Sequence, residues 1–135
     1  MEIWQKRWEE DQKGRRYHKL QKSVITKIYT ERNRREDIII TRLRLDHTGL
    51  NGTLFIMGKS EVEECRGCGV KENVEHIVLH CNMYKTEREK LRDRVREAGR
   101  EWSLMGILGT EGEGVRATRK AILKYLSETG LIGRI

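Results

Sequence analysis

The stretch that decides the fold runs from Glu64 to Cys81 and reads ECRGCGVKENVEHIVLHC; it holds the three cysteines of the chain. Together with His76, the cysteines form the pattern Cys65-x2-Cys68-x7-His76-x4-Cys81. Three thiolates and one imidazole make the closed, tetrahedral ligand set of a structural zinc ion. Glycines at positions 67 and 69 allow the tight turn that brings the first two thiolates to one ion. The pattern therefore predicts zinc as the cofactor, bound by Cys65, Cys68, His76 and Cys81.

The fourth ligand has two candidates, because His80 directly precedes Cys81. On an ideal helix His80 shares a face with His76, whereas Cys81 lies about 140° away from it. Binding by Cys81 would thus require the helix to tighten or to end near His80. A thiolate is the stronger zinc ligand, which favours Cys81, and His80 stays the alternative at this point.

Two other interpretations of the cysteines are an inert buried group and a redox pair formed by Cys65 and Cys68. A redox dithiol usually opens a helix after a strand, whereas this pair lies in a glycine-containing turn. Three cysteines also cannot pair completely, which favours metal binding in a reducing compartment over a disulfide framework. A fully ligated ion has no open position for water, so we expect a structural role for it.

The composition predicts a mostly α fold. The chain has 135 residues, no proline, and 36% each of hydrophobic and charged residues. Glu, Lys, Arg and Leu are good helix formers. Because few residues can form a hydrophobic core, a bound structural metal ion would add stability that the core does not supply. We expect a small helical domain around a CCHC zinc knuckle, with helical N- and C-terminal arms. The expected parts are a helical arm at 1–35, the zinc-knuckle domain at 36–99 and a helical tail at 100–135.

Hydrophobic spacing and capping residues place the individual helices. Helices are expected over residues 3–29 with a break at Gly14, then over 36–46, 50–55, 74–79, 83–98, 103–109 and 115–128. Asn73 is an expected N-cap, and Gly58 and Gly99 are expected helix ends. The last helix is expected to bury one stripe, made of Ala121, Ile122, Tyr125 and Leu126.

The net charge of +7 and the pI near 9.5 indicate an acidic partner. The charge is uneven: +5 over residues 1–46, −2 over residues 47–81 and +4 over residues 82–135. A nucleic-acid backbone suits such a chain, because Lys and Arg neutralise phosphates; salt-bridged, solvated helix faces are the alternative. The candidate residues for binding RNA or DNA are Arg15, Arg16, Arg42, Arg44, Arg88 and Arg92.

The sequence gives no sign of a membrane segment. It contains no apolar run near the roughly 20 residues that span a bilayer, and its N-terminus is charged and amphipathic, without a secretory h-region. We therefore expect no membrane partner and an intracellular location, in the nucleus or the cytoplasm.

Several motifs together resemble one family. They are the run from Ile40 to Asn51, the Cys65 and Cys68 pair, the run from Val74 to Cys81, and Tyr84 with Arg88. This part of the chain looks like the C-terminal, zinc-binding tail of non-LTR (LINE-type) retrotransposon polyproteins. Trp4 and Trp8, with Gly14 and Arg15, resemble the linker upstream of that tail, and residues 125–135 resemble the end of such a reading frame.

The resemblance implies a function. It matches Cys65, Cys68, His76 and Cys81 to the zinc ligands, and it weighs for Cys81 over His80. It implies a module that assists RNA or DNA engagement without catalysis of its own, while the parent polyprotein would be an RNA-directed DNA polymerase. The alternative is a zinc-folded protein-interaction module that docks the reverse transcriptase or RNase H domains of that polyprotein. We find no paired polymerase aspartates and no two-metal nuclease set in the sequence, so the chain is expected not to be an enzyme.

Overall fold

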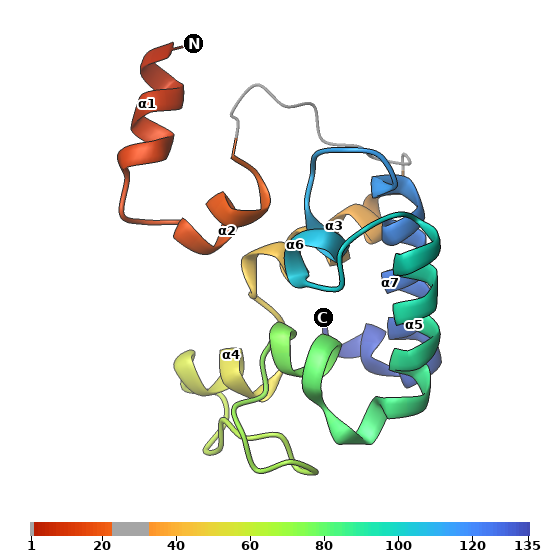
Figure 1. The fold of residues 1–135 in the computed structure, drawn as a ribbon. Coiled ribbons are helices and arrows are strands. Elements are labelled where there is room, and N and C mark those ends of the chain that lie inside the picture. The colour runs from red at the N-terminus through yellow and green to blue at the C-terminus, as the bar shows by residue number, and fades with distance from the viewer. Residues whose placement is uncertain (1, 23–32) are drawn as a thin grey trace.

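The computed structural model describes residues 2–22 and 33–135, and it confirms the mostly helical fold (Figure 1). The α-helices of the described residues are α1 (Glu2–Glu10), α2 (Arg15–Leu20), α3 (Arg34–Leu45), α4 (Asn51–Ile56), α5 (Lys85–Glu97), α6 (Leu104–Leu108) and α7 (Val115–Thr129). The described part of the chain also has three short turns: a π-helical turn at His76–His80, a 3-10 turn at Asn82–Tyr84, and a 3-10 turn at Leu131–Arg134 that follows α7. The second half of the first expected helix, residues 23–29, lies outside the described residues.

Glycine and asparagine end and begin the helices as the sequence predicts. Gly58 and Gly99 follow α4 and α5 in the left-handed conformation, with φ of 71° and 70°, which glycine adopts at no steric cost. The side chain of Asn73 accepts a hydrogen bond of 2.8 Å from the amide of His76. Gly14 separates α1 from α2 with φ of 68°. Local sequence signals therefore set these helix boundaries.

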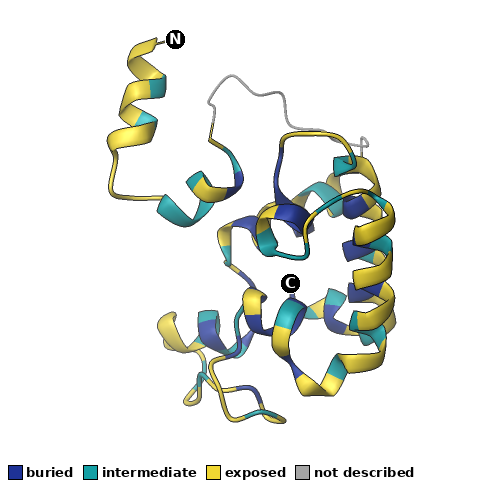
Figure 2. Ribbon diagram, viewed as in Figure 1, coloured by how far each residue is buried: buried dark blue, intermediate teal, exposed yellow. Residues whose placement is uncertain are grey.

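The core lies where α5 packs along α7, with α3 and α6 against them (Figure 2). The predicted stripe of α7, Ala121, Ile122, Tyr125 and Leu126, is buried. One buried cluster contains residues as far apart as Leu20, Leu91 and Ile135. The residues of this core come from all three expected parts, 1–35, 36–99 and 100–135. The division of the chain into these parts stays a prediction.

Helix α1 lies at the edge of the fold and buries none of its residues. It is tied down at its end, where Trp8 Nε1 donates to the carbonyl of Gln21 at 3.0 Å and Trp8 packs edge-on against Tyr17. Trp4, in contrast, is 63% exposed. No helix among the described residues combines the length and the apolar composition needed to cross a membrane.

Candidate metal centre

A tight loop positions Cys65 and Cys68. The amide of Cys65 donates to the carbonyl of Val70, and the amide of Gly69 donates back to the carbonyl of Cys65. Gly69 closes the turn with φ of 68°, a left-handed conformation that is costly for residues with a Cβ. Gly67 is not among the glycines with positive φ. Of the two candidate glycines, Gly69 is therefore the one whose backbone the turn requires.

His76 and Cys81 are brought together by an unusual helical turn. The helix that begins at Val74 widens, and the amide of Cys81 donates to the carbonyl of His76, five residues back, at 2.7 Å. Cys81 itself is extended, with φ of −63° and ψ of 125°, so the helix ends there. The expected end near His80 is confirmed, whereas the alternative of a tightened helix is wrong. A π turn holds more residues than an α turn, which returns Cys81 to the side of His76 and leaves His80 exposed.

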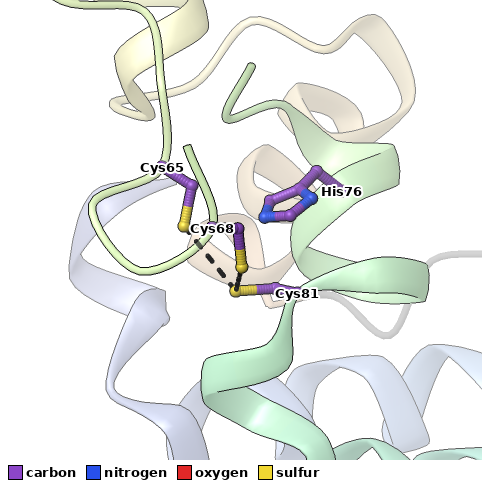
Figure 3. Close-up of side chains that lie close together, drawn as sticks. All are labelled: Cys65, Cys68, His76 and Cys81. Carbon is purple, nitrogen blue, oxygen red and sulfur yellow. Dashed lines mark hydrogen bonds between the residues drawn. The ribbon is translucent and has the colours of Figure 1, made fainter. Parts of the chain in front are cut away.

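The four predicted ligands form one group, here called the Cys3His group: Cys65, Cys68, His76 and Cys81 (Figure 3). Their ligand atoms all lie within 4.8 Å of one another. Cys81 Sγ is 3.7 Å from Cys65 Sγ and 3.8 Å from Cys68 Sγ. Around a tetrahedral zinc ion with Zn–S bonds of about 2.3 Å, two sulfurs are about 3.8 Å apart. Cys81 Sγ thus already lies at the spacing of a tetrahedral site from each of the other two sulfurs.

His76 is prepared to act as a ligand. A ring nitrogen of His76 faces the sulfurs (Figure 3). Its Nε2 is buried and has no hydrogen-bond partner among the described residues, a state that is costly unless something binds there. Burial lowers the pKa of His76, which favours the neutral imidazole that a metal needs. A metal ion would satisfy this otherwise unpaired nitrogen.

The thiols of the group differ in their acidity. The amide of Asn82, 3.4 Å from Cys68 Sγ, lowers the pKa of Cys68 because it donates to the thiolate. Burial raises the pKa of Cys81 to about 12. Without a cation, Cys81 therefore stays protonated at neutral pH, and a metal ion must displace that proton.

The wide turn leaves backbone carbonyls that other helices satisfy. Tyr125 Oη of α7 donates to the carbonyl of Ile77. Arg88 of α5 donates through Nε to the carbonyl of Val78 at 3.3 Å, and its guanidinium also donates to the carbonyl of Cys81. Sequence reasoning missed these roles: it expected Tyr125 only as a core residue and Arg88 as a phosphate contact. Nothing in the local spacing signals them, because the partners are up to 48 residues apart.

We predict that Tyr125→Phe destabilises the protein by about 1–3 kcal/mol, the cost of a buried carbonyl left without its donor. The ring volume is kept, so the loss reports on the hydrogen bond to the Ile77 carbonyl. Urea unfolding of both proteins measures it. Tyr84→Phe is the matched control, because Tyr84 Oη makes no hydrogen bond among the described residues. Equal losses for the two variants would contradict the role given to Tyr125.

Three of the six arginines expected to bind nucleic acid serve the fold. Arg44 is buried and donates through Nε to the carbonyl of Leu108 at 2.8 Å, which links α3 to α6. Arg88 holds the wide turn, as described above. Arg15 donates to the carbonyls of Trp8 and Glu9 at the end of α1. These contacts are sufficient to explain why each residue is an arginine.

The other three reach the surface to different degrees. Arg16 forms an ion pair of 3.1 Å with Asp46 and is partly exposed. Arg42 is exposed and donates through one nitrogen to the carbonyl of Ile135 at 3.1 Å. Arg92 is exposed and stacks over the ring of Trp102, 5.8 Å from its centroid. Arg42 and Arg92 are therefore the exposed residues of the predicted set.

Comparison with known proteins gives one partial match. The chain is 35% identical over 89 residues, or 64% of its length, to the Retrovirus-related Pol polyprotein from type-1 retrotransposable element R1 2 of Nasonia vitripennis. The chain covers 21% of that relative and thus spans about a fifth of its length. No family model and no solved structure matches the chain. The chain is similar to part of a retrotransposon Pol polyprotein, and it carries a Cys3His group that could hold a metal ion.

Proposed function

We propose that this chain is a zinc-stabilised nucleic-acid-binding module of a retrotransposon polyprotein, without catalysis of its own. The observation that carries the proposal is the Cys3His group, whose ligand atoms lie within 4.8 Å of one another in a chain similar to a Pol polyprotein. Zinc is the metal that this ligand set favours, because soft thiolates select it over magnesium or calcium. With four protein ligands the ion has no open position, so it serves the fold.

The charge of the chain supports RNA or DNA as the partner. The net charge is +7, and the two basic parts of the sequence flank the slightly acidic metal segment. Binding through phosphate neutralisation depends little on the base sequence of the RNA or DNA. Such a module would act inside the cell, in the nucleus or cytoplasm, beside the reverse transcriptase and RNase H domains of the same polyprotein.

A second candidate function is docking of those protein domains. The observation that favours it is an apolar surface on and after α4, where Phe55, Ile56 and Met57 are 44%, 75% and 44% exposed. Contiguous exposed apolar side chains are typical of protein–protein contact sites. In that case zinc would only fold the module, and the arginines would be solvated.

A titration with single-stranded RNA across salt concentrations tests the proposed function. Phosphate binding predicts that log Kobs falls linearly with log salt, with a slope of about −0.7 for each phosphate contacted. We expect binding at about 50 mM salt and a steep loss by about 200 mM. Absence of binding to RNA and DNA at low salt, with the metal in place, would overturn the proposal and leave docking as the better account.

A further inference from the structure

One face of α3 is open and basic. Arg34, Arg35, Ile38, Thr41 and Arg42 recur at the three- and four-residue spacing that places them on one side of the helix; we call this the α3 face. Two adjoining grooves of about 550 and 520 Å³ flank it; both are lined by Arg34, Ile38 and Arg42, and Asp37 also lines the first. Arg34, Arg35 and Arg42 are exposed, and Ile38 is 39% exposed between them. Such a surface offers cations and one apolar contact to a ligand.

The acidic residues of this helix do not neutralise the arginines of the face. Asp37 pairs with Arg119 of α7 at 2.6 Å, and Glu36 lies 3.9 Å from the same guanidinium. Arg119 is buried, and the side chains of Glu36 and Asp37 that it contacts are 35% and 31% exposed. The side chains of Arg34 and Arg35, in contrast, form no hydrogen bond or ion pair with any of the residues described. Within the described part of the chain, the charges of Arg34 and Arg35 are therefore not compensated.

The position of Arg34 and Arg35 is not explained by helix stability. Both lie in the first turn of α3, whose N-cap is Asn33. The helix dipole places partial positive charge at this end, so cations there are unfavourable. Two arginines that have no partner among the residues described, at the positive end of a twelve-residue helix, thus favour an anionic ligand over a role in folding.

We infer that the α3 face is the surface that binds the nucleic-acid backbone, with Arg34, Arg35 and Arg42 contacting phosphates and Ile38 packing against sugar or base. This inference rests on the proposed function and places it on one helix. Arg34 and Arg42 are eight residues apart, about 12 Å along the helix axis. A phosphodiester strand presents charges repeatedly over such a distance, whereas a single carboxylate does not.

The test compares Arg34→Gln/Arg35→Gln with the wild-type protein in titrations with single-stranded RNA and single-stranded DNA. At about 100 mM salt the double variant should bind roughly tenfold or more weakly, and its salt slope should be smaller by about 1.4, or 0.7 for each lost contact. The thermal melt should be unchanged or slightly raised, because two cations leave the positive end of α3. The control is Lys90→Gln/Lys124→Gln, which removes the same charge from exposed positions on α5 and α7.

The outcomes separate the inference from the proposed function. Wild-type binding with an unchanged affinity in Arg34→Gln/Arg35→Gln would overturn the inference while the proposed function stands. An equal loss in the lysine control would also overturn it, because net charge alone would then explain the effect. Binding of poly-glutamate as tightly as RNA would show an acidic protein segment to be the ligand. A wild-type protein that binds neither RNA nor DNA would remove the proposed function itself.

Discussion

Replacing Cys68 with serine is expected to unfold the segment from α4 to Cys81 and to abolish metal binding. Between Met57 and Asn73 the buried residues are Cys65 and Glu72, so this part of the segment has almost no apolar core; its last part, with Val74, Ile77 and Val78, packs into the main core. A structural zinc ion contributes on the order of 10 kcal/mol in small zinc peptides, and that binding free energy is folding free energy. Loss of one thiolate should therefore remove most of the stability of the segment.

A circular-dichroism melt and amide hydrogen exchange of Cys68→Ser measure this loss. Exchange protection should disappear in the loop around Cys65 and in the wide turn at His76–His80. His80→Ala is the matched control, because His80 lies beside the group, is exposed and is not one of its members. The account fails if the serine variant melts like the wild type, or if His80→Ala loses the metal to the same extent.

The affinity for zinc is expected to fall steeply as the pH falls. Three thiols must be ionised in the complex, and in the metal-free protein burial raises the pKa of Cys81 to about 12. At neutral pH zinc binding therefore releases about two to three protons, and each released proton weakens binding about tenfold per pH unit of acidification. Calorimetry in buffers of different ionisation enthalpy counts the protons. A pH-independent affinity between about pH 5.5 and 7.5 would contradict ligation by thiolates.

The metal-free protein should show the opposite trend. The raised pKa of Cys81 means that the folded state holds this proton more tightly than the unfolded chain, whose thiols ionise near 8.5. The resulting stability is fully present below about pH 8.5 and is lost as the pH rises toward 12. Urea midpoints of chelator-treated protein at about pH 7 and 9.5 measure this difference. The lowered pKa of Cys68 acts in the opposite direction, so the comparison is made in a Cys68→Ser background, where a midpoint that is higher at the alkaline pH would contradict the burial of a protonated Cys81.

The residues of the Cys3His group could be predicted from sequence because their chemistry is local. Two thiols separated by two residues converge through a turn that Gly69 closes, and His76 and Cys81 lie within one widened turn. Helix boundaries were equally accessible, since Asn73 and Gly99 act on their own neighbours. The widening of the turn itself was not foreseen, because an ideal helix separates His76 from Cys81.

The roles of individual arginines could not be predicted, because burial and long-range partners decide them. Arg44 and Arg42 occupy the same short helix and look equivalent in sequence. Arg44 is buried against the carbonyl of Leu108, 64 residues away, whereas Arg42 is exposed. Arg88 stands in a charged stripe typical of a solvated face, yet it donates to two carbonyls of the wide turn. Sequence spacing identifies a basic helix but not which of its cations face a ligand.

Native mass spectrometry of the purified chain, reduced and supplied with zinc, tests the central claim most directly. The account predicts a complex with one zinc ion per chain, its thiols protected from alkylation until a chelator removes the metal. A chain that stays metal-free in excess zinc, with all of its cysteines alkylated at the rate of free thiols, would contradict it.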